Sequence, residues 1–146
     1  MVRCDTTQST ASDRLRIYLN GVEATYGTYN NFTENGEGQV NEASTKHWLG
    51  RRNAGDYFDG YMAEYNFVDG TTLDPTYFGE TNNNGVWVPK KPDVSSYGTN
   101  GFYLQFKQTG TSANSSGIGA DTSGNDNHMS VTNLAATDVT TDTPTN

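Results

Sequence analysis

The sequence predicts an all-β fold, an antiparallel β-sandwich, from three observations. Aromatic residues are numerous, with nine Tyr, six Phe and two Trp in 146 residues, and they suit a pleated, half-buried surface. Asn-Gly and Asp-Gly pairs recur along the chain and signal tight turns, because these residues tolerate positive φ. No window of a dozen residues carries an apolar stripe of helical period. Residues 1–134 are predicted to form one domain, and the polar residues 135–146 a Thr- and Asp-rich tail or linker.

The first predicted element is a strand over residues 14–20, RLRIYLN. Leu15, Ile17 and Leu19 alternate with polar neighbours, so they face one way on a strand of period two. The Asn-Gly pair that follows predicts a hairpin turn into a second strand over residues 22–25.

The middle of the chain predicts a short strand, a turn and then a long strand. Residues 45–49, TKHWL, predict the short strand, and residues 51–56 the turn. Residues 58–68 lie largely between two Asp-Gly pairs and are rich in aromatic side chains, which predicts the long strand. This segment can also be interpreted as an ordinary strand of a β-meander.

The phase of the long strand predicts an irregularity inside it. Tyr65 and Phe67 alternate correctly, but Met62 is out of phase with both. If all three side chains point inward, one extra residue must be absorbed near Ala63–Glu64 as a β-bulge.

Three further elements complete the prediction. Residues 74–79 predict one helical turn. Residues 86–89 predict a short edge strand, because Pro89 cannot donate a hydrogen bond to a ladder. Residues 102–106, FYLQF, predict another alternating strand. The remainder is rich in Thr, Ser, Gly and Asn, which is typical of loops.

The segment FDGYMAEYNFVDGTTLDP, residues 58–75, resembles the closing strand of a concanavalin A-like, or LamG (laminin-G-like), jelly roll. It shares the aromatic-Asp-Gly start, the alternating apolar positions and the Leu-x-Pro end. A wider, ordered set of short motifs resembles structural proteins of marine tailed bacteriophages. The set comprises the stretch from Asp5–Gln8 through Asn20–Val22, followed in order by Trp48–Gly50, Phe58–Pro75, Gly101–Leu104, Gly119–Asn125 and Asp142–Asn146.

The resemblance implies a non-enzymatic module of a virion, a phage tail or fibre component. A whole jelly roll of this type has several strands before the equivalent of residues 14–20. The chain is therefore expected to be the C-terminal part of such a domain, with unpaired strand edges that folded proteins avoid. Other virion chains, or further copies of this chain in a homo-oligomer, are the expected partners. A capsid decoration protein is an alternative role.

Charge and composition exclude several function classes. The net charge is −8 and the pI about 4.5, and the basic residues are scattered. Nucleic acid and anionic membranes are therefore not expected partners. Neither a transmembrane-length run nor a signal-peptide apolar region is visible, so a virion component released by lysis is the expected localisation. Cys4 is the single cysteine, which rules out an intrachain disulfide.

Residues 121–127 present oxygen-bearing side chains at alternate positions, an arrangement seen in calcium loops. The candidate ligands are Asp121, Ser123, Asn125 and Asn127. A bidentate Glu is missing at the spacing of an EF-hand, and Asp and Ser also cap their own backbone in Asx- and ST-turns. A structural turn and a calcium site are the two interpretations, and calcium is the one cofactor considered.

Enzyme activity is not predicted, and no catalytic residue is assigned. A polysaccharide-degrading glycoside hydrolase of the same fold is the alternative function. Such enzymes carry Glu-x-Asp-x-x-Glu on one strand as nucleophile and acid. Here Glu64 is followed two residues later by Asn66, and Glu-x-Asp occurs nowhere in the chain.

Aromatic residues in or beside polar loops are the candidate contacts to a host-surface carbohydrate, because rings pack on the C–H faces of sugars. The alternative is that these rings close the edge of the core or are ordinary exposed aromatics. The candidates are Tyr26, Tyr29, Phe32, Tyr57 and Trp87.

Overall fold

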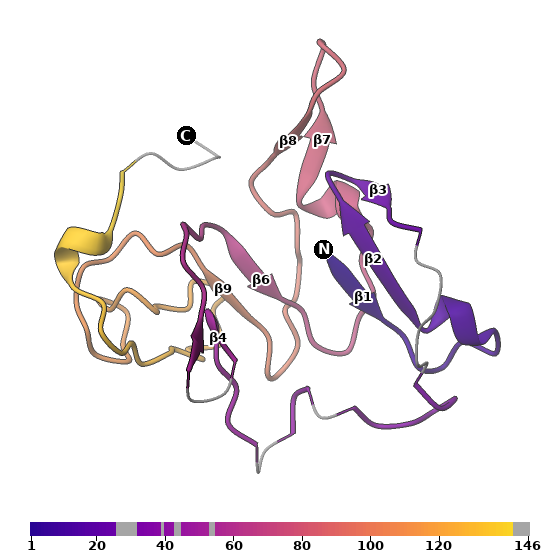
Figure 1. Ribbon diagram of the computed structural model, residues 1–146, viewed down its shortest axis with the longest axis horizontal. Helices are drawn as coiled ribbons and strands as arrows, with labels where there is room; N and C mark the ends of the chain where they lie inside the picture. Colours follow the sequence, from indigo (N-terminus) through magenta and orange to yellow (C-terminus); the bar gives the residue numbers. More distant parts are fainter. Residues whose placement is uncertain (26–31, 39, 43–44, 53–54, 142–146) are drawn as a thin grey trace.

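The computed structural model describes residues 1–25, 32–38, 40–42, 45–52 and 55–141 (Figure 1). Within these residues every strand pair is antiparallel, which confirms the β-structure that the sequence predicts. The strands lie in four small sheets, of order β1-β2-β3, β4-β5, β6-β9 and β7-β8. Helical structure in the described residues is limited to single 3-10 turns, η1 (Ala11–Asp13), η2 (Pro75–Tyr77) and η3 (Ala136–Asp138).

The N-terminal sheet contains β1 (Val2–Cys4), β2 (Leu15–Leu19) and β3 (Val22–Glu23). Asn20 and Gly21 connect β2 to β3 with φ values of 49° and 78°. Two successive positive φ values are the mark of a type I′ turn, whose twist matches that of the flanking strands. The predicted hairpin is thus confirmed.

This sheet turns its apolar side chains to the solvent. Val2 is paired with Ile17, and Leu19 with Val22, so all four side chains project from the same side. They are 67%, 39%, 72% and 70% exposed, in the order Val2, Ile17, Leu19, Val22. We call these four residues the outer face.

The opposite side of the sheet carries charge and is partly covered. Arg3 and Arg16 are cross-strand partners and are half-buried. Arg16 forms ion pairs with Asp13 at 2.9 Å and Glu23 at 2.8 Å, and Arg3 lies 3.6 Å from Asp74. In most antiparallel sheets the apolar side faces the rest of the domain and the polar side faces the solvent. In this sheet the arrangement is inverted.

The hairpin of β7 (Gly79–Thr81) and β8 (Trp87–Pro89) lies beside β2 and β3 (Figure 1). The Trp87 indole covers the backbone of Gly21 and of Gly79, where an added Cβ would collide with the ring. Glycine at these two positions lets the indole join the two hairpins. The edge strand predicted over residues 86–89 is confirmed as β8.

At the centre, β6 (Tyr65–Phe67) pairs with β9 (Phe102–Leu104). The predicted long strand over residues 58–68 is wrong, because only three of its residues pair. Glu64 has a φ of 53°, which interrupts the extended backbone immediately before β6. The irregularity thus falls where the phase of the apolar residues predicted a bulge, but it marks the start of the short strand β6 instead of bending a longer one.

Two expectations for residues 45–56 are also wrong. Residues 45–49 form no strand, because Thr45 N–H bonds back to Glu42 in a local turn at 3.0 Å. The predicted turn over residues 51–56 instead contains the short strands β4 (Arg51–Arg52) and β5 (Asp56–Tyr57). Gly50, directly before β4, has a φ of 70°, a backbone conformation that glycine adopts without steric cost.

The core lies where β9 meets residues 117–121. Its buried apolar side chains are Tyr97, Tyr103, Leu104, Ile118 and Ala120. Two glycines permit close backbone approach: a Cβ at Gly101 would overlap the Tyr97 carbonyl, and one at Gly119 the Met129 carbonyl.

The remaining predicted elements are confirmed in whole or in part, and the domain boundary is not tested. The helical turn predicted over residues 74–79 is confirmed as η2, and the strand over 102–106 is confirmed in part as β9. The boundary between residues 1–134 and the tail 135–146 stays a prediction; η3 lies inside this tail, and residues 142–146 are outside the described part. Across the described residues, no helix has the length and apolar character needed to cross a membrane.

Candidate functional site

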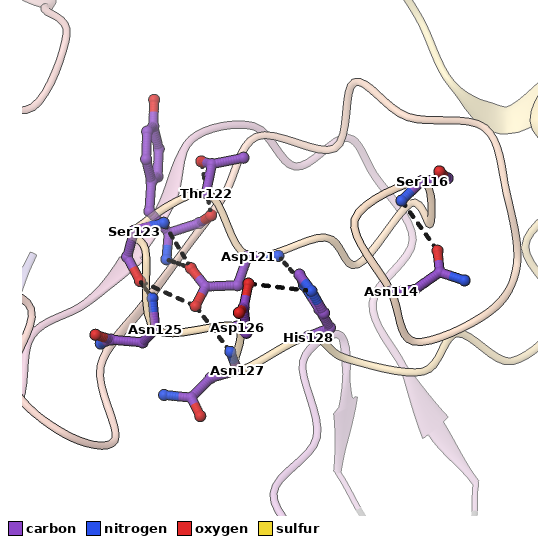
Figure 2. Close-up of polar contacts among 10 residues, drawn as sticks. Asn114, Ser116, Asp121, Thr122, Ser123, Asn125, Asp126, Asn127 and His128 are labelled. Atoms are coloured by element: carbon purple, nitrogen blue, oxygen red, sulfur yellow. Dashed lines mark hydrogen bonds and ion pairs between the residues drawn. The ribbon is translucent and has the colours of Figure 1, made fainter.

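The loop that follows the core strand is organised by one buried carboxylate, Asp121 (Figure 2). Its Oδ1 accepts hydrogen bonds from the backbone N–H groups of Tyr103 and Ser123, both at 2.8 Å. Its Oδ2 accepts from the Ser123 hydroxyl and the Asn127 backbone N–H, both at 2.9 Å. The carboxylate therefore ties β9 to the start and the end of its own loop.

The amide side chains of Asn125 and Asn127 fasten this loop to the turn before β9. Asn125 Nδ2 donates to the carbonyls of Gly98 and Gly101 at 2.6 and 2.9 Å. Asn127 Nδ2 donates to the carbonyls of Thr99 and Gly101 at 3.0 and 2.9 Å. Both amides are thereby oriented by the backbone that they hold.

These contacts bear on the calcium interpretation. The structure brings Asp121 and Ser123 into direct contact, and the Ser123 N–H bond to Asp121 Oδ1 is that of an Asx-turn. The amides of Asn125 and Asn127 are instead used in long-range hydrogen bonds to the Gly101 carbonyl. In the part of the chain that the structure describes, no three His, Cys, Asp or Glu side chains converge as a metal-binding group. The calcium site stays a prediction.

His128 completes the loop and was not singled out by its sequence position. Its Nδ1 accepts the Asp121 backbone N–H at 2.9 Å, so the neutral ring carries its proton on Nε2. That nitrogen lies 3.6 Å from Asp126. The hydrogen bond between the Asp121 backbone and the His128 ring closes the loop over seven residues, so the role of His128 is structural. This i+7 spacing from Asp121 is the sequence signal that could have identified it.

A polar cluster lies on one side of the β6–β9 pair. The Tyr103 hydroxyl donates to Glu64 Oε2, and the Tyr97 hydroxyl donates to Asn66 Oδ1 at 2.7 Å. The two tyrosine rings stack with centroids 6.2 Å apart. Asn66, at the position where the hydrolase motif would have Asp, thus accepts a structural hydrogen bond. Burial, followed by the nearby charges of Asp121 and Glu64, raises the pKa of Tyr97 to about 12.

The raised pKa of Tyr97 predicts a loss of stability at alkaline pH. An unfolded tyrosine ionises near pH 10, whereas the folded pKa is about 12. The stabilisation from this difference is complete below pH 10 and is lost as pH rises through about 12. We expect urea denaturation to show this loss in the unsubstituted chain and a smaller one in Tyr97→Phe.

The experiment needs a neutral-pH reference value and a control variant. Tyr97→Phe removes the hydrogen bond to Asn66, so we expect it to lower the free energy of unfolding by about 1 kcal/mol at neutral pH. Tyr61→Phe is the matched control, because Tyr61 is 87% exposed and should leave the pH dependence unchanged. An identical alkaline profile for Tyr97→Phe and the unsubstituted chain would contradict the assignment.

The predicted carbohydrate contacts do not form one site in the described residues. Tyr26 and Tyr29 lie outside them. The Phe32 ring is half-buried beside Gly38, and the Trp87 ring covers the glycines of two hairpins. Tyr57 remains 64% exposed and lies against a different group of residues.

That group is an aromatic–arginine cluster formed by Trp48, Arg51 and Tyr57. The Arg51 guanidinium carbon lies 5.0 Å from the Trp48 ring centroid and 5.8 Å from that of Tyr57. Arg51 and Tyr57 are cross-strand partners in the β4–β5 hairpin. Sequence reasoning missed Trp48 and Arg51 because it placed a strand and a turn where the hairpin forms.

Comparison of the chain with protein-family models, with curated proteins and with solved structures gave no match. What the chain can bind is therefore inferred from its own surfaces. The two that stand out are the outer face of the N-terminal sheet and the aromatic–arginine cluster.

Proposed function

We propose that this chain is a non-enzymatic structural and adhesion module of a phage virion, a tail or fibre component built on jelly-roll-type β-structure. In this proposal it assembles with further copies of itself through the outer face of the N-terminal sheet. The observation that carries the proposal is the inverted polarity of that sheet. The fold type is supported by the sequence resemblance of residues 58–75 to a LamG-like closing strand, of which β6 (Tyr65–Phe67) is the paired part.

The outer face offers a useful but modest free energy of association. Fully burying one aliphatic side chain stabilises by roughly 1.5–3 kcal/mol, so four half-exposed ones on each of two copies supply on the order of 10 kcal/mol. Association itself costs about 4–15 kcal/mol. A single pair of copies is therefore expected to associate weakly, and a repeated array within a particle more firmly.

A second copy is the occupant that the charges favour. The four residues of the outer face are uncharged, while Arg3, Arg16 and Glu23 project from the opposite side of the sheet. Two outer faces can therefore meet without placing like charges in contact. The net charge of −8 on each copy adds a long-range repulsion that salt screens within about 8 Å at physiological ionic strength.

We expect sedimentation velocity to show self-association that strengthens with protein concentration and with salt. Leu19→Lys places a charge at the most exposed position of the outer face and should weaken the association at least about tenfold, because a desolvated, unpaired ammonium is unfavourable. Val86→Lys is the matched control, since Val86 is 55% exposed and lies outside the outer face.

A monomer at every concentration and salt level would contradict self-assembly through this face. Equal weakening by Leu19→Lys and Val86→Lys would show that added charge acts without regard to position. A complex with a different virion chain, abolished by Leu19→Lys alone, would assign the face to that chain.

A further inference from the structure

A small open pocket lies between η2 and the segment that follows β8. It has a volume of about 230 Å³ and is lined by Thr76, Tyr77, Lys90 and Asp93. None of these residues belongs to the outer face or to the aromatic–arginine cluster. Pockets for drug-sized ligands measure roughly 300–1,000 Å³, so this pocket has the size for a single small ring.

Backbone hydrogen bonds hold the two walls of the pocket together. The N–H of Lys90 donates to the Phe78 carbonyl, and the N–H of Asp93 donates to the Tyr77 carbonyl, both at 3.1 Å. The η2 wall is closed as a turn, because the Tyr77 N–H donates to the Asp74 carbonyl at 3.1 Å. The pocket is therefore pre-formed, which lowers the entropic cost of binding a ligand.

The lining side chains combine a ring with hydrogen-bond donors and acceptors. Tyr77 is 37% exposed and offers an apolar ring surface with a polar hydroxyl at its edge. Lys90 carries three N–H donors, Asp93 carries two acceptor oxygens, and the Thr76 hydroxyl both donates and accepts. Within the described residues neither Lys90 nor Asp93 takes part in an ion pair. Their polar groups therefore remain available to a ligand.

The charge around the pocket favours an uncharged ligand. Residues 74–93 contain three acidic and two basic side chains, which are Asp74, Glu80 and Asp93, and Lys90 and Lys91. Asp74 is paired with Arg3 at 3.6 Å, and this third cation brings the two signs into balance. The local field therefore selects neither an anion nor a cation.

We infer that this pocket binds one neutral hexopyranose ring, as the terminal sugar of a host-surface glycan. The C–H face of the sugar packs on the Tyr77 ring. A sugar hydroxyl is both a donor and an acceptor, so neighbouring hydroxyls donate to Asp93 and accept from Lys90 in the same complex. This inference deepens the adhesive part of the proposed function and rests on it.

Proton–nitrogen correlation NMR of the full chain tests both the ligand class and the place of binding. The probes are the methyl glycosides of β-galactose, β-glucose and α-mannose, with glycine as a zwitterionic comparison. We expect at least one glycoside to shift the amide signals of residues 76–78 and 90–93. The expected Kd is on the order of 1 mM, because a ligand of few atoms binds weakly. It should not change with salt, because the ligand is uncharged.

Two substitutions and a control test the carboxylate and the ring. Asp93→Asn should weaken binding roughly tenfold, because a hydrogen bond to a charged acceptor is replaced by one to a neutral amide. Tyr77→Ala should weaken it at least as much, whereas Tyr77→Phe keeps the ring surface and should retain most of the affinity. Glu80→Gln is the matched control, because Glu80 is an exposed carboxylate of the same hairpin that does not line the pocket.

A second matched pair tests the ammonium group. Lys90→Met removes the donor and should weaken binding several-fold. Lys91→Met removes the same group from the neighbouring residue, which is exposed and does not line the pocket, and should leave the Kd unchanged. The urea denaturation midpoint of each variant shows whether it is folded, so a loss of binding is read only from folded chains.

Three results would overturn the inference: no shift with any glycoside, shifts confined to residues outside 76–78 and 90–93, or a Kd unchanged by Asp93→Asn. A response to glycine with none to the glycosides would also overturn it and would assign the pocket to zwitterionic ligands.

The assembly experiment distinguishes this failure from failure of the proposed function. If no glycoside binds but Leu19→Lys weakens self-association, the sugar assignment fails and the assembly role stands. If a glycoside binds in the pocket of a chain that stays monomeric, the sugar site stands and assembly through the outer face fails.

Discussion

Replacing Asp121 with Ala is expected to lower the free energy of unfolding by on the order of 4 kcal/mol, because four hydrogen bonds to a buried charged group are lost together. The donors are the N–H groups of Tyr103, Ser123 and Asn127 and the Ser123 hydroxyl. Asp121→Asn is expected to be nearly as damaging. An amide has one oxygen, so its NH₂ group must face donors that the second carboxylate oxygen accepts.

Urea denaturation at neutral pH measures both changes. Asp126→Ala is the matched control, because the Asp126 side chain is 87% exposed and reaches only the ring of His128 at 3.6 Å in the contacts described. We expect it to change the free energy of unfolding by less than about 0.5 kcal/mol. A comparably small effect of Asp121→Ala would show that the carboxylate does not organise the loop.

The same denaturation experiment tests the predicted calcium site. If Asp121, Ser123, Asn125 and Asn127 hold calcium, a chelator should lower the denaturation midpoint of the unsubstituted chain and leave that of Asp121→Ala unchanged. If the loop is a structural turn alone, calcium and chelator leave both midpoints where they are.

Leu104→Ala is expected to destabilise the chain by about 2–5 kcal/mol, as removal of a fully buried leucine does when the surroundings only partly collapse. Leu104 has no exposed surface and is the largest side chain buried to that degree in the described residues. It is opposite Tyr65 in the β6–β9 ladder and bridges to Asp121 on its other side. The substitution therefore opens a cavity where the central strand pair meets the Asp121 loop.

Thermal and urea unfolding check this expectation with two companion variants. Leu134→Ala removes the same atoms at a position 44% exposed and should have little effect. Leu104→Met keeps most of the volume and should cost less than about 1.5 kcal/mol. Equal stability of Leu104→Ala and Leu134→Ala would place the core elsewhere.

The elements that the sequence predicted well are those that local chemistry determines. The β2–β3 hairpin follows from Asn20-Gly21, where two positive φ values are tolerated. The turn at Pro75 and the edge strand ending at Pro89 follow from the fixed φ and missing N–H of proline. The strand predicted over residues 58–68 was wrong because pairing depends on a partner, and β9 reaches only Tyr65–Phe67.

The candidate sites show the same division. The alternation of oxygen-bearing side chains marked residues 121–127, but the sequence left open whether they serve an ion or their own backbone. The hydrogen bond that Asp121 accepts from β9 comes from Tyr103, eighteen positions away, which local spacing does not reveal. The aromatic–arginine cluster was missed for a related reason: Arg51 and Tyr57 become neighbours only through the β4–β5 pairing.

The sequence by itself determined that the chain is antiparallel β-structure, where its tightest turns lie, and that the N-terminal sheet has one apolar and one charged side. Only the tertiary structure decided which side faces the solvent. Alternation with a period of two separates the sides of a strand but assigns neither of them to the core. That assignment depends on what packs against the sheet. Here Arg3 forms an ion pair with Asp74, whereas the side chains of Leu19 and Val22 are exposed to solvent.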